Sequence, residues 1–178
     1  MQNWRFPSAT WRFLPALAGA ALLLAGCGLG DRDTGLEEVP PEIGAEQEQA
    51  MCDRLFASSS TGALPKTAGA VIGEGGAVDA TAGRKTVNLV DFEGQKGGYV
   101  RLSVSPDNES PVFLMQIQDV PFAAVHEDGT EVDYYDAGDP VCTDAEGRYL
   151  WIVRGSENHL RFGPTSATSI DIVIEVVE

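Results

Sequence analysis

The chain has little of what most catalytic and metal sites require. Its 178 residues include three cysteines and two histidines, and no Gly-x-Ser-x-Gly, His-Glu-x-x-His or phosphate-loop motif occurs. His126 and His159 lie near no cysteine and form no ligand-spaced pair, which argues against a zinc site. A hydrolase built on Ser156, Glu157 and His159 is the weaker alternative, because Ser-x-x-His is not a catalytic motif. We therefore predict a protein that is not an enzyme.

Basic residues are also scarce. The chain has 12 Lys and Arg residues against 27 Asp and Glu residues, a net charge of −15. An acidic surface repels nucleic acids and anionic lipids, so we expect no nucleic-acid partner. The plain interpretation is a solvated acidic surface, which also suits cations or basic partners.

The chain has one long apolar run, and that run is short for a membrane-spanning helix. Residues 14–26 follow a stretch that contains Arg5 and Arg12 and no acidic residue, the pattern of a secretory signal. The run ends in Leu24-Ala25-Gly26-Cys27, which resembles the lipobox of bacterial lipoproteins. The resemblance implies that residues 1–26 are removed and that Cys27 carries the lipid. An ordinary signal peptide with an incidental cysteine is the alternative.

This resemblance implies that the protein is located in the bacterial cell envelope. Acyl chains hold a protein to a bilayer at about 0.8 kcal/mol per buried methylene. Gly28 rather than Asp follows Cys27, so by the sorting rule of enteric bacteria we expect the outer membrane. Loss of Arg5 and Arg12 leaves 10 basic and 27 acidic residues, a net charge of −17. The expected partners are the membrane, through the anchor, and an envelope protein or glycan.

The other two cysteines form a natural pair. An exported protein enters an oxidising compartment, so we predict a disulfide between Cys52 and Cys142. Such a bridge closes a loop of roughly 90 residues, for which chain entropy gives about 4–5 kcal/mol. Because Cys52 lies in a predicted helix, the bridge would staple that helix to the main domain. Two buried free thiols are the alternative.

The mature chain divides into a spacer, a helical segment and a β domain. Residues 27–41 are acidic, end in two prolines and predict a flexible spacer. Within residues 42–83, apolar positions over Glu42–Phe56 follow a helical period. The remainder of that segment is rich in small residues, with one short strand expected at 70–72. We expect this segment to pack on the main domain, residues 84–178.

From residue 84 onward the hydrophobic period changes to two, which indicates half-buried antiparallel strands. Asp128-Gly129 between two strand-like runs is a strong hairpin signal. His159 alternates with Leu160 and Phe162, so we expect it to face solvent. About eight short strands at regular spacing predict an all-β fold. The expected architecture is an antiparallel β-sandwich, jelly-roll or Ig-like, with a short N-terminal helix after a flexible acidic spacer.

Three segments in this order carry a second resemblance. They are GGYVRLSV, the hairpin VHEDGTEV with Asp128-Gly129-Thr130, and GRYLWIVRG with Gly147-Arg148-Tyr149. Together with a final strand they resemble the bacterial pre-peptidase C-terminal domain over roughly residues 84–178. The resemblance implies a non-catalytic accessory or binding module, in some members with calcium. The final strand lacks the usual aromatic residue, and no protease domain precedes it.

Two acidic segments offer the oxygen ligands that calcium prefers. Neither SPDNES nor DYYDAGD has EF-hand spacing, and turns in which Asp and Asn bond their own backbone are the alternative. We expect no other cofactor. The candidate calcium ligands, which all lie in predicted loops, are Asp107, Asn108, Glu109, Asp133, Asp136 and Asp139.

Two adjacent tyrosines offer a second kind of binding site. On a strand, one of Tyr134 and Tyr135 faces outward and could stack on a sugar. Tyr149 and Trp151 share a face that we expect to lie in the core. We therefore predict a non-catalytic binding or structural module, with a calcium- or carbohydrate-binding domain as the alternative.

Overall fold

The computed structural model divides the chain into two units, Met1–Glu37 and Glu38–Glu178. Only the second unit has residues that can be described, so the predicted signal peptide, Cys27 and residues 28–39 of the spacer lie outside them. Asp107 and Asn108 lie outside them as well. The described residues are 40–58, 64–81, 83–104, 109–154 and 158–177.

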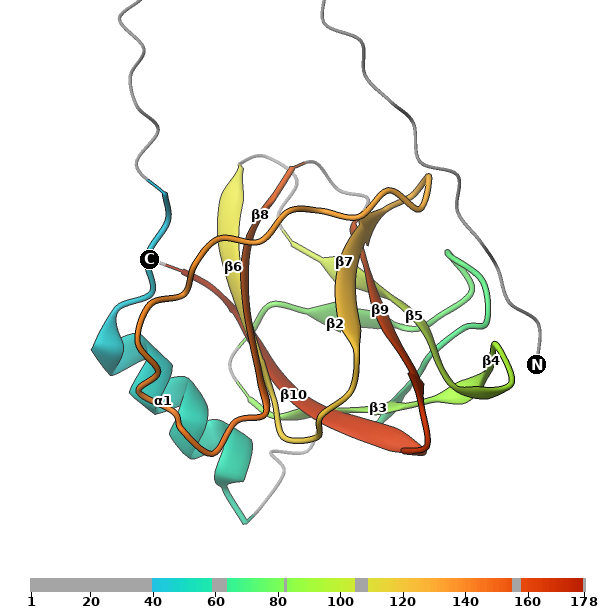
Figure 1. Ribbon diagram of the computed structural model, residues 1–178, viewed down its shortest axis with the longest axis horizontal. Helices are drawn as coiled ribbons and strands as arrows, with labels where there is room; N and C mark the ends of the chain where they lie inside the picture. The colour runs from blue at the N-terminus through green and yellow to red at the C-terminus, as the bar shows by residue number, and fades with distance from the viewer. Residues whose placement is uncertain (1–39, 59–63, 82, 105–108, 155–157, 178) are drawn as a thin grey trace, which may run out of the picture. The chain divides into compact units, whose positions relative to one another are not determined.

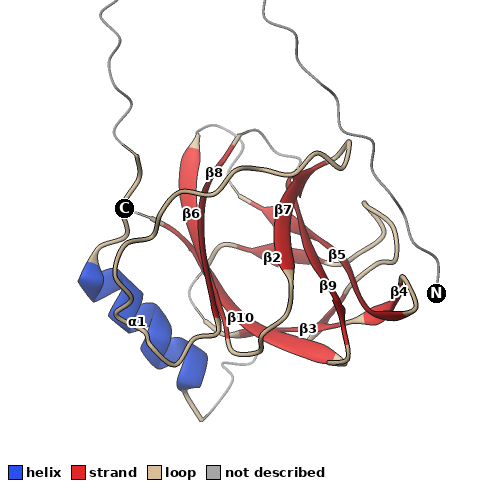
Figure 2. Cartoon of the chain, in the orientation of Figure 1, coloured by secondary structure: helices blue, strands red, loops and turns tan. Residues whose placement is uncertain are grey.

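Within these residues the chain forms one helix and ten strands, which confirms the all-β expectation (Figures 1 and 2). The helix, α1 (Ala45–Phe56), comes first. The strands are β1 (Lys66–Thr67), β2 (Ala77–Asp79), β3 (Lys85–Asn88), β4 (Val90–Phe92), β5 (Gln95–Ser103), β6 (Ser110–Gln116), β7 (Phe122–His126), β8 (Gly147–Val153), β9 (Asn158–Thr165) and β10 (Ser169–Val176).

The strands form two sheets that face one another across a shared core (Figure 1). The first has the order β1-β3-β10-β6-β8, and the second has the order β2-β5-β9-β7, with β4 paired to β5. From β5 onward, each successive strand lies in the other sheet. Of the two predicted architectures, jelly-roll and Ig-like, this alternation matches the jelly roll. The pairings are antiparallel except at two short edge strands, β1 on β3 and β2 on β5.

The main core lies between the sheets and follows the predicted period of two. Val100 and Leu102 are buried whereas Arg101 and Ser103 are exposed. The buried members of this cluster are Ala68, Val78, Val87, Leu89, Val100, Leu102, Val112, Leu114, Val120, Ala124, Trp151, Val153, Leu160, Phe162, Ile170, Ile172 and Ile174.

A second, smaller core lies on the outer face of the first sheet, under α1 (Figure 1). Met51 and Leu55 of the helix pack there, because they fall one turn apart on its apolar face. This layer explains why β6 reads as evenly apolar, since its side chains are buried on both faces of the sheet. The buried members are Met51, Leu55, Phe113, Met115, Cys142, Leu150, Val173 and Val177.

The strand expected at residues 70–72 is wrong. These residues form a bend and turn, and the strands of this region are β1 and β2 on either side. A Cβ atom added at Gly75 would lie 1.9 Å from the carbonyl oxygen of Tyr99. The small residues therefore allow the loop to approach β5 closely, and they do not form a strand.

The run KTVNLVDF, residues 85–92, forms two short strands, β3 and β4. It breaks at Leu89, whose N–H donates to the carbonyl of Thr168 at 2.9 Å, and the chain passes from the first sheet to the second. Glu93 and Gly94 then turn the chain between β4 and β5 with φ of 51° and 81°. Two successive positive φ values match the type I′ hairpin turn.

The Asp128-Gly129 turn is present, but its second arm is not a regular strand. The arms are joined by two backbone hydrogen bonds of 2.9 Å, from the N–H of His126 to the carbonyl of Thr130 and from the N–H of Val132 to the carbonyl of Ala124. Residues 127–146, which we call the strap, then cross from β7 to the helix side of the molecule before entering β8 (orange in Figure 1). The N–H of Tyr135 donates to the carbonyl of Leu150 at 2.7 Å, so the strap also covers part of the β8 edge.

Candidate functional site

The strap is covalently attached to α1. Cys52 of the helix and Cys142 of the strap form a disulfide, as the cysteine count predicts, with their Cα atoms 5.6 Å apart. Cys142 is buried in the second core. The disulfide is a covalent link between the irregular strap and α1, in addition to the noncovalent contacts between them.

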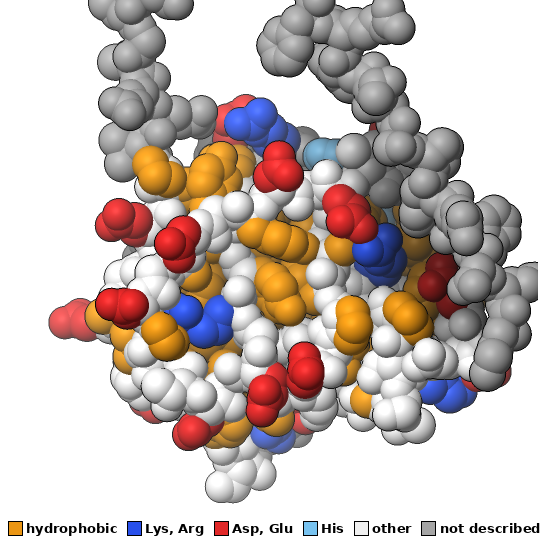
Figure 3. Space-filling view, viewed as in Figure 1, with side chains coloured by type: hydrophobic (Ala, Val, Ile, Leu, Met, Phe, Trp, Pro, Cys, Tyr) orange, Lys and Arg blue, Asp and Glu red, His pale blue; other side chains and the backbone are white. Residues whose placement is uncertain are grey.

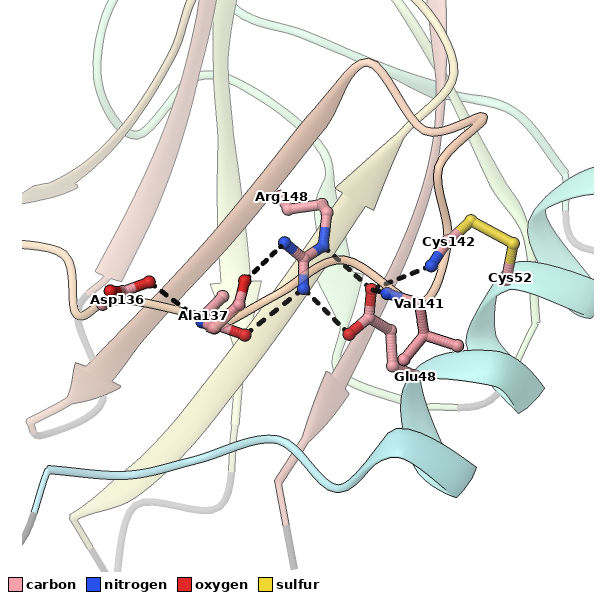
Figure 4. A network of polar contacts seen from close by, with 8 residues as sticks. Glu48, Cys52, Asp136, Ala137, Val141, Cys142 and Arg148 are labelled. Atoms are coloured by element: carbon pink, nitrogen blue, oxygen red, sulfur yellow. Dashed lines mark hydrogen bonds and ion pairs between the residues drawn. A yellow bond between two sulfur atoms is a disulfide. The ribbon is translucent and has the colours of Figure 1, made fainter.

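A buried ion pair lies beside the disulfide (Figure 4). The Oε1 atom of Glu48 accepts from Nε of Arg148 at 2.9 Å, and Oε2 accepts from Nη2 at 2.8 Å. Oε1 also accepts from the backbone N–H groups of Val141 and Cys142, both at 3.1 Å. Glu48 is 1% exposed, so its charge depends on these partners.

Arg148 extends the same network to the middle of the strap. Its guanidinium donates to the carbonyls of Gly138 and Ala137 at 3.2 and 3.3 Å. It also lies over the ring of Phe113, 5.7 Å from the centroid. These contacts tie Glu48 and Arg148 to residues 137–142 of the strap, so the pair positions that segment.

Glu48 was not predicted as a site residue, and Arg148 was named only as part of the Gly147-Arg148-Tyr149 segment. A signal for Glu48 does exist, because it shares the helical stripe of Met51, Cys52 and Leu55 at spacings of three, four and seven residues. An acid on an apolar stripe predicts a buried partner. Nothing in the sequence identifies that partner as Arg148, which lies 100 residues away.

Glu48 forms the floor of a groove between the start of α1 and the strap. The groove has a volume of about 480 Å³. Its walls combine apolar side chains with exposed carboxylates, and acidic side chains are scattered over the helix side of the face in Figure 3. The lining residues are Pro40, Pro41, Glu42, Ile43, Ala45, Glu48, Asp136, Ala137, Gly138, Asp139 and Val141.

Aromatic side chains from β7, β8 and the strap form a cluster of ring contacts. Apolar side chains also gather at the middle of the face shown in Figure 3. The Tyr149 ring lies 4.6 Å from that of Phe122 and 5.4 Å from that of Tyr134. Tyr134 is 40% exposed, and its hydroxyl accepts from the N–H of Ala124 at 2.7 Å. Partial burial raises the pKa of Tyr134 to about 12.

The two predicted ligand-binding tyrosines thus have different environments. Tyr134 keeps an exposed face within the aromatic cluster. Tyr135 is half-buried and packs against the second core instead. Tyr149, expected in the core, lies half-buried beside Tyr134, whereas Trp151 is fully buried beneath them.

The candidate calcium ligands do not gather into a site within the described residues. Asp133, Asp136 and Asp139 are exposed, and Asp136 accepts from the N–H of Gly138 at 2.9 Å, which is ordinary turn chemistry. Glu109 is paired with Arg154 at 3.7 Å. No group of three or more His, Cys, Asp or Glu residues in the described ranges could hold a metal ion.

The expectation that His159 faces solvent is wrong, because it is only 4% exposed. β9 lies between β5 and β7, so His159 has Arg101 and Val125 as neighbours on either side. The other members of the hydrolase alternative, Ser156 and Glu157, lie outside the described residues.

No protein-family model matches the chain, and no curated protein matches it either. The lipobox and pre-peptidase resemblances therefore rest on the sequence features alone. In the described part of the chain, no helix has the length and apolarity needed to cross a bilayer.

Proposed function

We propose that the protein is a lipid-anchored component of the bacterial cell envelope, with a β-sandwich that serves as a non-catalytic binding module. The observation that carries this proposal is the use of the cysteines. Two of the three are paired, as suits an oxidising compartment, and the third is Cys27 at the lipobox-like sequence. The outer membrane is the proposed location, from Gly28 at the position after Cys27.

The arrangement of the strap supports a binding role over a catalytic one. The Glu48–Arg148 pair is committed to internal hydrogen bonds, so it holds a surface loop in one shape. A loop held rigid on a scaffold is a common way to present a binding surface, because little ordering entropy remains to be lost on binding.

The test of the anchor is a Cys27→Ser variant expressed in a bacterial host and followed by membrane fractionation. We expect the wild-type protein in the outer-membrane fraction and the variant in the soluble fraction, because the acylated thiol is lost. A Gly28→Ala variant, which keeps Cys27, should remain with the membrane. Retention of Cys27→Ser in the membrane fraction would contradict the proposal.

A glycan ligand at the aromatic cluster is the second candidate. It is favoured by the exposed face of Tyr134 beside Tyr149, because aromatic faces can pack against the C–H face of a sugar ring. Retention on envelope polysaccharide should fall in Tyr134→Ala and persist in Tyr135→Phe. Equal retention of both variants would remove this candidate, provided that their melting temperatures match.

A further inference from the structure

The groove beside α1 carries acidic groups without counter-charges of their own. Glu42, Asp136 and Asp139 line it and are exposed. None of the ion pairs formed among the described residues involves any of the three. The pair beneath them, Glu48 and Arg148, is neutral as a unit. The groove is therefore negative at its rim.

The walls of the same groove are apolar and rich in acceptors. Pro40, Pro41 and Ile43 form one side, and Val141, which is 38% exposed, lies on the other. Because proline has no N–H, Pro40 and Pro41 contribute no backbone donors to this wall. An apolar wall with carboxylates above it fits a lysine or arginine side chain, whose stem is apolar and whose head only donates.

The strap side of the groove is held in place before any ligand arrives. The carboxylate of Glu48 binds the N–H groups of Val141 and Cys142, and Arg148 binds the carbonyl of Ala137. The disulfide ties the strap to the helix at the next turn. The volume of about 480 Å³ accommodates a long side chain with part of its backbone.

We propose that this groove binds a basic segment of a partner protein, with a lysine or arginine side chain between Glu42 and the Asp136–Asp139 stretch of the strap. Charge complementarity selects this occupant over an acidic or purely apolar one. The inference rests on the proposed binding role and names the chemistry of the partner.

The test uses the full chain, purified with its anchor in neutral detergent micelles. The probe is a fluorescent nine-residue peptide of alternating lysine and alanine, compared with the same peptide carrying glutamine at each lysine. We expect the lysine peptide to bind at low salt and to weaken as salt rises, and the glutamine peptide not to bind. Equal binding of the two peptides would overturn the proposal.

Whether the peptide binds in this groove is tested with the triple variant Glu42→Gln, Asp136→Asn and Asp139→Asn, which removes the charges and keeps the shapes of the side chains. The peptide should bind about tenfold more weakly, as expected for the loss of three exposed ion pairs. Loss of binding no larger than in the matched control variant would overturn the assignment of the groove.

The matched control removes the same charge elsewhere, through Glu74→Gln, Glu127→Gln and Asp144→Asn, all at exposed positions. It should bind within about twofold of wild type, because long-range attraction is largely screened. If spermidine displaces the peptide at an equal or lower concentration, the groove takes small polyamines and the partner proposal fails. Membrane release of Cys27→Ser is measured separately, so failure of the anchor and failure of the groove remain distinguishable.

Discussion

The two cores of this domain are built in different ways. The core between the sheets is apolar and is filled from both sides by alternate strand residues. The core under α1 is about half its size in buried residues, and it includes a cystine and borders the buried Glu48–Arg148 pair. The large core is thus stabilised by the apolar surface that it buries. The small core is stabilised in addition by a covalent bond and by hydrogen bonds.

This difference follows from how much surface each layer can remove from water. A twelve-residue helix against one sheet face buries few side chains, here Met51 and Leu55 as the large apolar ones. At roughly 25 cal/mol per Å² of buried apolar surface, the hydrophobic free energy of this patch only slightly exceeds the entropic cost of ordering the helix and the strap. Specific polar and covalent links therefore determine where the strap lies.

The largest expected effect comes from removing the disulfide. Cys52→Ala with Cys142→Ala should lower the free energy of unfolding by up to about 4–5 kcal/mol, because the bridge closes a loop with a sequence separation of 90 residues. Denaturant unfolding measures this loss. Reductant should destabilise the wild type to a similar extent and leave the double variant unchanged. Equal stability of wild type and double variant would mean that the bridge does not form.

The next effect compares matched leucines in the two cores. Leu160→Ala, in the central strand β9, should cost about 4 kcal/mol, because the sheets cannot close on the cavity. Leu55→Ala should cost about 2–3 kcal/mol, since the helix can shift inward and alanine favours helix. Equal losses for both would show that the outer layer is as rigid as the sandwich.

A smaller effect is expected for the buried ion pair. Arg148→Met should cost about 3 kcal/mol, because Glu48 stays buried without its partner. The double variant Glu48→Gln with Arg148→Met should lose less than the sum of the two single variants, as measured by a double-mutant cycle. Additive losses would mean that the two side chains act independently.

The smallest effect concerns Tyr134 and appears only at high pH. The pKa of its phenol rises to about 12 through burial, against about 10 in an unfolded chain. The stability that the neutral phenol contributes is complete below pH 10 and is lost as the pH rises through about 12. In a phenolate absorbance titration, Tyr134→Phe should remove the step near pH 12, whereas Tyr135→Phe should keep it. Persistence of that step in Tyr134→Phe would assign it to another tyrosine.

The main core was predictable because its signal is local. In β5 and β10 the apolar residues recur at every second position, and Ile170, Ile172 and Ile174 all lie inward as expected. The helix was predictable for the same reason, although it starts at Ala45 and not at Glu42. The N-cap position is Gly44, and the residues before it belong to the groove wall instead.

The outer layer and the site were less predictable, because they depend on partners far along the chain. His159 has the pattern of an exposed strand residue, yet it is buried on a strand that lies between β5 and β7. Residues 70–72 have strand-forming side chains, yet the glycines around them bring the loop against Tyr99. The pairing of Glu48 with Arg148 depends on how α1 packs against the sheet that contains β8, which no local pattern encodes.

The disulfide also determines the path of a mechanical load. The shortest covalent path from Pro40 to the last strands runs along α1 to Cys52 and then through the sulfur–sulfur bond into Cys142. Strands β1 to β7 are encoded between these two cysteines, so the backbone that forms them would be bypassed by the load. A pull on the N-terminal end of the tethered domain would therefore reach β8 to β10 through covalent bonds that bypass β1 to β7. Strands β1 to β7 would be held by their neighbours in the sheets.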